Sequence, residues 1–519
     1  MISEGLRKSI HVLMGGFALL LRVLPWWAAA CLAAVAVASN ATWIPKLGGG
    51  RLMRQEERES LLKSGVWLYS FSVLVLILIF RQHLEIVACA WGILAFGDGF
   101  ATLAGKGLEG PRLPWNPKKS WVGSTAFVLS GTMGGAVFMH WVAGRGSHPP
   151  TWGRVLVLSG AAALACAAVE SLSLKLNDNL SVPFLAAGLV ASLDKVDPTL
   201  LRESALPPWR DFLLAILVNL IVALAARASG AVSWSGVAGG LAVGLTTAIF
   251  GGIPAFGVLT FQFLLASAAT KLGYAGKAAR GIAQEKGGAR GAVHAFANCS
   301  VGAYLAFLAS SVPSPLKEAL WLAFVASLAT AVCDTLGSEI GPLARGNPFL
   351  LTHLRRVPAG TPGAVSFLGT AAGGVGALLV GSVAALLRVI PAAWVGFVGV
   401  AALLGTFLES LLGATLEARN LVESETINFI REALARFGGA LVVEPVWARE
   451  PAFSLEDFPG LLPAVHAAAA ALGSDLRCTH RLRLRSQSGP ATSGELESSC
   501  HRDPGVPLRS VSERRVQRY

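Results

Sequence analysis

The first residues suited to chemistry form a cluster of an acid, glycines and a lysine in residues 97–106, with the sequence GDGFATLAGK. Asp98 ends an apolar run. Glycines let backbone N–H groups approach a phosphate, lysines neutralise its charge, and a carboxylate holds an Mg²⁺ ion that bridges phosphate oxygens. We therefore expect residues 97–120 to form a phosphate-binding loop with Asp98 as a catalytic and metal-binding residue. The side chains expected to contact the phosphates are Lys106, Lys118, Lys119 and Ser120.

Two further acids follow, Glu170 and Asp178. They are suited to a second metal contact or to accepting the proton of an attacking hydroxyl. No G-x-x-x-x-G-K-[ST] motif occurs, which excludes a P-loop. Two alternatives remain open: Asp98 as a helix-end carboxylate near lysines, and the lysine pair before Ser120 as a topology signal alone.

The same order of residues occurs again later in the chain. The segment CDTLGSEIG, residues 333–341, places Asp334 at the end of another apolar run, followed by small residues and a turn. A Glu-Ser step follows Asp98 by 72 positions, at Glu170, and follows Asp334 by 75, at Glu409. An Arg and a His at i,i+4, which share one helix face, precede each copy. These pairs are Arg7 with His11 and Arg290 with His294. The histidines have a second interpretation as interfacial residues, and the serines as helix-packing residues.

The composition favours a polytopic membrane protein over a soluble enzyme. Of the 519 residues, 53% are hydrophobic and 14% charged, and the mean hydropathy is +0.58. The apolar runs are too long and too uniform for the alternating strands of an outer-membrane barrel. The sequence therefore predicts an all-α, polytopic membrane helical bundle of about fourteen spans. Among the expected spans are residues 84–97, 232–250 and 253–270.

The repeat predicts two diverged homologous units, residues 1–200 and 210–435, joined by a polar segment that contains prolines. Residues 437–519 resemble neither unit. From residue 473 onward this extension has too little apolar surface to offset the entropy of ordering. We expect it to be largely disordered and assign it no function.

The net charge of +12 and the cysteines bear on location. Cations gather in residues 51–63, 271–290 and 345–356, so the positive-inside rule places these loops and both sets of acids on the cytoplasmic side, as in a bacterial cytoplasmic membrane. The first apolar run lacks a small-residue cleavage site and is interpreted as a retained span. The seven cysteines form no C-x-x-C set, and we expect neither a disulfide framework nor a zinc site.

Several blocks resemble known families. The blocks LRKSIHVLMGG, FGDGFATLAGKGLEGPRLPWNPKKSWVGSTAF and VESLSLKLNDNLSVP of the first unit resemble the phytol kinase and dolichol kinase family, which is more distantly similar to phosphatidate cytidylyltransferases. In the second unit, EKGGARGAVHAFAN, CDTLGSEIG, VPAGTPGAVSFLGT and LESLLGATLEARNLVESETINF resemble the transmembrane family that includes plant phytyl-phosphate kinase.

The resemblance implies a bifunctional enzyme of isoprenoid salvage. The first unit would transfer phosphate from CTP to an isoprenoid alcohol such as phytol, geranylgeraniol or farnesol. The second would phosphorylate the monophosphate to the diphosphate. The implied cofactor is Mg²⁺, and the implied partners are CTP, the alcohol and its monophosphate, and membrane lipid, without nucleic acid.

The resemblance also implies roles for individual residues. In the first unit it adds Glu170, Asp178 and Asn179 to the site. In the second unit Asp334 would bind metal and act in catalysis, and Glu409 stands where that family more usually has a shorter Asp. The further implied residues of the second unit are Glu339 for catalysis and Lys286, Arg290, Ser338, Ser410 and Asn428 for nucleotide binding, with His294, like Arg7 and His11, in support.

Two other functions stay open at this point. A cytidylyltransferase that joins CTP to a lipid phosphate would need the same cations and carboxylate. A transporter built from membrane repeats is a third possibility, although the polar residues of both units are expected at one membrane face. An apolar groove gives no sequence signal for the length of the alcohol.

Overall fold

The computed structural model describes residues 4–43, 64–108, 110–146, 149–171, 177–280, 288–344, 346–352, 355–358, 361 and 363–417. These residues all belong to one compact unit, residues 1–449. The predicted extension of residues 437–519 and the candidate residues Lys286 and Asn428 lie outside the described residues.

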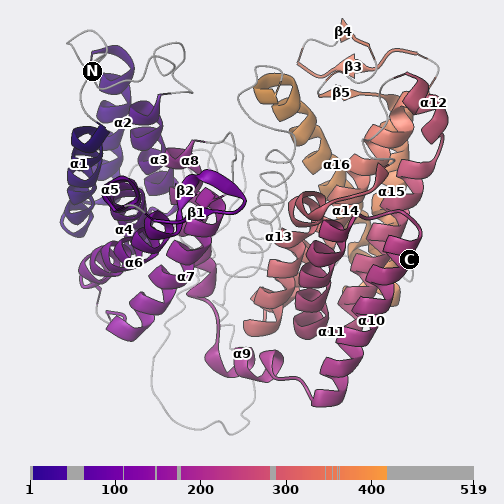
Figure 1. Ribbon diagram of the computed structural model, residues 1–519, viewed down its shortest axis with the longest axis horizontal. Coiled ribbons are helices and arrows are strands. Elements are labelled where there is room, and N and C mark those ends of the chain that lie inside the picture. The colour runs from indigo at the N-terminus through magenta and orange to yellow at the C-terminus, as the bar shows by residue number, and fades with distance from the viewer. Residues whose placement is uncertain are drawn as a thin grey trace, which may run out of the picture. The chain divides into compact units, whose positions relative to one another are not determined.

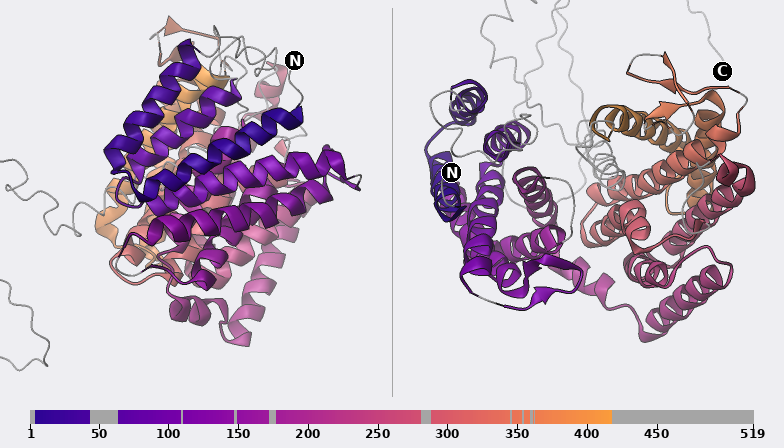
Figure 2. Two further views of the ribbon diagram at one scale, coloured as in Figure 1. Left: turned by 90° about the vertical axis from the view of Figure 1, so that its left-hand side faces the viewer. Right: turned by 45° about the horizontal axis from the view of Figure 1, so that its top comes forward.

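The chain is an all-α membrane protein, as its apolar runs predict. The helices of the first half pack against one another in both Figure 1 and Figure 2. Their bounds are α1 (Glu4–Gly15), η1 (Gly16–Arg22), α2 (Trp26–Thr42), α3 (Gly65–Ile79), α4 (Leu84–Gly92), η5 (Ile93–Asp98), α5 (Gly99–Gly107), α6 (Trp121–Ala143), α7 (Trp152–Ser171) and α8 (Asp178–Leu193).

A short helix, α9 (Pro198–Ala205), precedes the second half. The later helices are α10 (Trp209–Ala228), α11 (Trp234–Lys271), α12 (Tyr274–Ala279), α13 (Ala292–Ser311), α14 (Leu316–Ile340), η7 (Gly341–Leu343), α15 (Phe367–Leu386), η8 (Ala392–Trp394), α16 (Val395–Leu412) and η9 (Gly413–Glu417). The largest groups of buried apolar side chains are two separate clusters, one within residues 18–190 and one within residues 215–402.

Each half also contains a small antiparallel sheet just before a helix. In the first half, β1 (Arg112–Leu113) pairs with β2 (Asn116–Ser120), which runs directly into α6. In the second half, β3 (Phe349–Leu350) pairs with both β4 (Arg355–Arg356) and β5 (Ala364–Val365), and α15 follows β5 (Figure 1). In both halves a serine directly precedes the helix and caps it. Ser120 accepts a hydrogen bond from the Gly123 N–H, and Ser366 accepts one from the Gly369 N–H. Such a cap satisfies a donor that the first helical turn leaves without a partner.

In the described part of the chain, nine helices are long and apolar enough to cross a membrane, and three shorter apolar helices accompany them. Large apolar side chains on their outer faces remain exposed; on α10, for example, Ile221 is 57% exposed. A helix that is apolar all round and exposed on one side is typical of contact with lipid. The number nine differs from the expected fourteen partly because residues 232–250 and 253–270 join into α11, which is broken by Gly252 at φ 67°.

Candidate active site

The helix that carries Asp98 continues where a loop was expected, so the predicted loop conformation is wrong over residues 97–107. Asp98 ends the π-helical turn η5, and α5 carries the chain on through Lys106. A π-helical turn is wider than an α-helical one and occurs frequently at functional sites. The turn buries Asp98, which is 4% exposed, inside the first half.

The glycines serve helix packing here, which explains why they do not make a loop. A Cβ on Gly97 would lie 3.0 Å from the Phe127 ring of α6. A Cβ on Gly105 would lie 3.3 Å from Ser120 Oγ and 3.5 Å from the Gly123 Cα. Small residues let two membrane helices approach closely. The close approach of α5 to α6 is thus what brings Asp98 near the end of β2.

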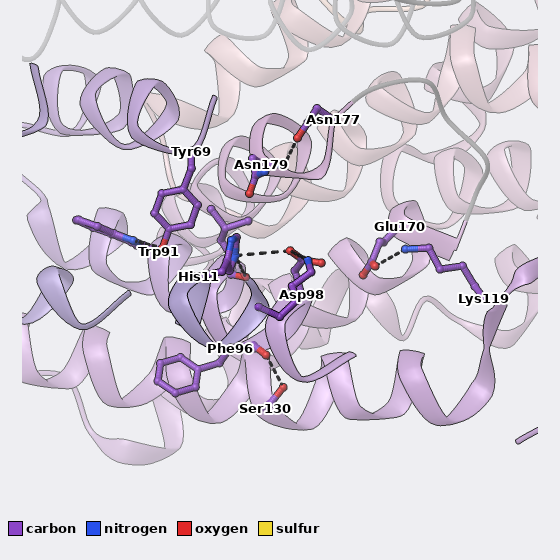
Figure 3. Close-up of polar contacts among 12 residues, drawn as sticks. His11, Tyr69, Trp91, Phe96, Asp98, Lys119, Ser130, Glu170, Asn177 and Asn179 are labelled. Atoms are coloured by element: carbon purple, nitrogen blue, oxygen red, sulfur yellow. Dashed lines mark hydrogen bonds and ion pairs between the residues drawn. The ribbon is translucent and has the colours of Figure 1, made fainter. Parts of the chain in front are cut away.

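Two side chains of α1 reach Asp98. Lys8 Nζ donates to Asp98 Oδ2 at 2.6 Å, and His11 Nε2 lies 3.5 Å from the same oxygen and 3.3 Å from the Leu94 carbonyl oxygen. The His11 ring makes an edge contact with Tyr69, whose hydroxyl accepts from Trp91 Nε1 at 2.6 Å. In Figure 3, Asp98 lies between His11 on one side and Glu170 on the other.

Sequence reasoning proposed Arg7 and His11 as supporting residues and missed Lys8. The signal was present, because Lys8 lies one turn before His11 on the same helix face. His11 contacts Asp98 as described above, whereas Arg7 lines the cavity beside the site.

Glu170 is held at the end of α7 by the strand β2. Lys119 Nζ forms an ion pair with Glu170 Oε1. Asn116 Nδ2 donates to the Ser171 carbonyl oxygen at 2.9 Å, which fixes the end of α7 against β2. Burial alone would lower the pKa of Lys119, but the carboxylates of Glu170 and Asp178 outweigh it and raise the pKa above its ordinary value. Lys119 is therefore a firmly charged cation facing a group of acids.

Asp98, Glu170 and Asp178 come together although up to 80 positions separate them in the sequence. Among the described residues, they form the only group of three or more His, Cys, Asp or Glu side chains close enough to hold a metal ion together, with ligand oxygens within 4.8 Å of one another. Carboxylate oxygens are the ligands that Mg²⁺ prefers. Asn179 adds a side-chain oxygen, Oδ1, that is buried and has no hydrogen-bond partner. The donor set therefore fits a hard divalent cation with a bound phosphate.

A cavity of about 1470 Å³ opens onto these acids. Its wall includes every first-unit residue that the sequence singled out for the site: Arg7, His11, Asp98, Lys106, Lys118, Lys119, Ser120, Glu170, Asp178 and Asn179. Drug-sized ligands occupy cavities of roughly 300–1,000 Å³. The volume is thus large enough for two substrates together.

In the second half the predicted residues are more dispersed. Glu339 of α14 is buried and forms an ion pair with Lys277 of α12, a residue that sequence reasoning missed. Lys277 is 1% exposed and also donates to the Thr270 carbonyl oxygen at 3.1 Å. The same residue of α11, Thr270, also accepts a hydrogen bond through its side chain: Arg290 Nη2 donates to Thr270 Oγ1 at 3.2 Å. Burial lowers the pKa of Arg290, while the nearby acids Glu339 and Asp334 act in the opposite direction.

The remaining predicted residues of the second half are placed as follows. Asp334 lies within α14, one turn or more before its end, and not at a turn. Ser338 is exposed and donates to the Thr335 carbonyl oxygen. His294 lines a cavity of about 100 Å³ with Arg290. Glu409 and Ser410 lie near the end of α16. Within the described ranges, the acids of this half do not form a group like that of Asp98.

The two halves nevertheless share one set of contacts. Gly105 and Gly341 each follow the candidate aspartate by seven positions. A Cβ on Gly341 would lie 2.7 Å from Ser366 Oγ and 3.6 Å from the Gly369 Cα, which repeats the contacts of Gly105 with Ser120 and Gly123.

Each Glu-Ser step also lies near residues that precede the capping serine of its half. Asn116, four residues before the capping serine of α6, contacts the Ser171 carbonyl. Gly363, three residues before the capping serine of α15, packs against the backbone of Ser410. The lysines are not repeated, because Ala364 and Val365 stand directly before Ser366 where Lys118 and Lys119 stand before Ser120.

Comparisons with known proteins place the chain, through its second half, among integral membrane proteins. Residues 217–439 match a family described as integral membrane protein DUF92. An uncharacterized membrane protein of Synechocystis, sll0875, is 34% identical over 247 residues, which cover 47% of this chain and 93% of the relative. The protein named VTE6, chloroplastic, from Arabidopsis thaliana is 28% identical over 48% of this chain and 77% of its own length.

A third relative carries the name of an activity. A protein from Triticum aestivum named probable phytol kinase, chloroplastic, is 34% identical over 142 residues, or 27% of this chain. The chain spans about half, 47%, of the length of that relative. No solved structure matches the chain significantly.

Proposed function

The chain belongs to the DUF92 family of integral membrane proteins through residues 217–439, and from this premise we propose that it is a membrane kinase of isoprenoid alcohols. The proposal for the first half is phosphoryl transfer from CTP to the hydroxyl of an isoprenoid alcohol. The similarity to a protein named probable phytol kinase supports the class of reaction. CTP rests on the family resemblance of the sequence blocks, because charges bind the phosphates of any nucleotide.

The observation that carries the proposal is the meeting of Asp98, Glu170 and Asp178 with Lys119 at the wall of one cavity. Phosphoryl transfer needs positioning and charge stabilisation more than covalent help from the protein. The lysines of the first half that face carboxylates can also form charge-assisted hydrogen bonds with the phosphates of a nucleotide. The orphaned Asn179 Oδ1 is an acceptor for a ribose or base donor.

The alcohol oxygen bonds to the γ-phosphorus of CTP, the bond from that phosphorus to the β-bridging oxygen breaks, and CDP leaves. The hydroxyl proton passes to one of the carboxylates of the group, for which Asp178 and Glu170 are the candidates. Lys119 stabilises the charge that develops on the phosphate oxygens. A bound Mg²⁺, held by Asp98 and by whichever of the other two carboxylates does not take the proton, would supply further charge neutralisation there.

For the second half we propose phosphorylation of the monophosphate to the diphosphate, with Asp334, Glu339 and Glu409 as the acids. The shared contacts of Gly105 and Gly341 support a common origin for the two helix pairs. The cations of this half would come from other elements, since Arg290 lies near Asp334 and Glu339 and the Arg355–Arg356 pair lies on β4. The similarity to protein VTE6 is compatible with this assignment but names no reaction.

The experiment uses membranes that contain the full chain, γ-labelled CTP and geranylgeraniol. The proposal expects label first in the monophosphate and then in the diphosphate. Label in pyrophosphate together with a CDP-lipid identifies a cytidylyltransferase and overturns it. The absence of any labelled lipid, combined with uptake of a solute into vesicles, identifies a transporter. Asp98→Asn is the inactive control, and the exposed Ala34→Ser is the matched active one.

A further inference from the structure

The cavity beside Asp98 continues away from the acids as an apolar arm. We define this arm by the side chains Leu21, Leu24, Ala29, Ala33, Ala36 and Ile77, all of which line the cavity. They belong to η1 and the turn after it, to α2 and to α3. None of the six carries a polar side-chain group, so this part of the cavity offers nothing to a nucleotide.

The direction of the arm follows from the contacts between its helices. Asn40, near the end of α2, donates to Ser70 Oγ at 3.0 Å. The neighbouring Tyr69 touches His11, which itself reaches Asp98. The C-terminal end of α2 therefore lies at the level of the site, and Ala36, Ala33 and Ala29 follow at increasing depth along that helix. From Tyr69 to Ile77 the arm runs for roughly 12 Å at 1.5 Å per residue.

Small side chains keep this arm open. The α2 side chains that line the cavity include three alanines about one turn apart, Ala29, Ala33 and Ala36, beside one larger side chain, Leu32, and Ile77 of α3 lines the cavity as well. Larger side chains at those positions would fill the space, because helices packed this closely leave few voids. Replacing one of these alanines by a larger side chain should therefore shorten the apolar arm of the cavity.

We propose that the apolar arm holds the isoprenoid tail of the acceptor alcohol, and that Ala36, Ala33 and Ala29 set the longest tail accepted. The inference rests on the proposed function and names the part of the same site that selects the substrate. A tail in the arm places its hydroxyl at the mouth beside His11 and Asp98, while the phosphates occupy the polar end with Lys119. Burial of apolar tail surface supplies the binding free energy and leaves the head groups to fix orientation.

The test compares geraniol, farnesol and geranylgeraniol as acceptors for the wild type and for Ala36→Phe and Ala33→Phe. Each variant should lower kcat/KM for the tails that reach the new ring by about tenfold or more and leave shorter tails nearly unchanged. The order matters: Ala36→Phe should exclude shorter tails than Ala33→Phe does. The matched control is Ala34→Phe, which adds the same ring to an exposed position of α2 that does not line the cavity.

A second measurement does not depend on turnover. A farnesol analogue with a photoreactive group at the tail end should crosslink to the peptides of α2 and α3, and Ala36→Phe should abolish that crosslink. If Ala36→Phe lowered kcat/KM equally for all three alcohols, or left the preference for alcohol length unchanged, the tail assignment would be overturned and the kinase proposal would stand. A crosslink at α2 without any phosphorylation would support the proposal that the arm binds the tail and would contradict the proposal that the protein is a kinase.

Discussion

Lys8 Nζ lies 2.6 Å from Oδ2 of Asp98 and so fastens the first helix of the chain to the π-helical turn that carries the acid. Both side chains are largely buried, with exposed fractions of 13% for Lys8 and 6% for Asp98. A buried charge that loses its partner is strongly destabilising, whereas removing both charges together costs less. The pair therefore couples the docking of α1 to the state of the site.

A double-mutant cycle should measure that coupling. Lys8→Met should lower thermal stability and activity, because it removes the closest cation from the buried Asp98 carboxylate. That carboxylate then faces the acids Glu170 and Asp178, with His11 as its remaining ion-pair contact among the described residues. The double variant with Asp98→Asn should be more stable than the sum of the single effects allows, with a coupling energy on the order of 1 kcal/mol. Thermal unfolding in detergent is the measurement, and additive effects would show that the ion pair does not link α1 to the site.

The proposal of separate sites for the two phosphorylations predicts that variants can block one step without the other. Asp98→Asn should lower monophosphate formation on the order of 10³-fold while added monophosphate is still converted to diphosphate. Asp334→Asn should do the reverse. Chromatography of labelled products distinguishes the two steps. If either variant blocked both steps, a single composite site would replace the model of two.

The carboxylate group predicts a dependence on metal and nucleotide. Activity should disappear with a chelator, return with Mg²⁺, and be faster with CTP than with ATP. The metal requirement follows from the three carboxylates at the place where we propose that the phosphates bind, whereas the base preference follows from the resemblance alone. Equal rates with CTP and ATP would refute the preference for CTP without affecting the assignment of phosphoryl transfer.

Because the pKa of Lys119 is raised, we expect that mild alkali changes neither the charge of this side chain nor its contribution to activity. Because its pKa in the folded protein lies above the unfolded value, its stabilising contribution is complete below the unfolded pKa and is lost only as the pH rises through the folded one. Lys119 therefore stays charged well beyond neutral pH. Lys119→Arg should keep the same pH–rate profile between about pH 6 and 9, whereas Lys119→Met should raise KM for the nucleotide. A profile that shifts in Lys119→Arg would assign the titration to this side chain.

The charge distribution predicts that Lys118 and Arg355 both face the cytoplasm. Cysteines at these two positions, in a variant without the native cysteines, should react with a membrane-impermeant reagent only after the cells are opened. Labelling of either cysteine in intact cells would show that the two sheets do not share a membrane face.

The sequence by itself determined the class of this protein. Long apolar runs must bury their backbone polar groups in helices within a bilayer, so the all-α membrane architecture follows from composition and run length. The order of acid, cations and Glu-Ser step also singled out Asp98, Glu170 and Asp178, whose side chains do meet. The architecture could be inferred because it depends on local composition, and the three acids could be chosen as candidates because the choice depends on residue type.

The tertiary structure decided which residues become neighbours. Glycines beside Asp98 suggested a phosphate loop, but the same small side chains let α5 approach α6, and the helix therefore continues. Lys8 and Lys277 each became the ion-pair partner of a predicted acid from another helix, Asp98 and Glu339. A spacing pattern carries no information on such pairs, because their distance is set by how whole helices pack and not by the number of residues between them.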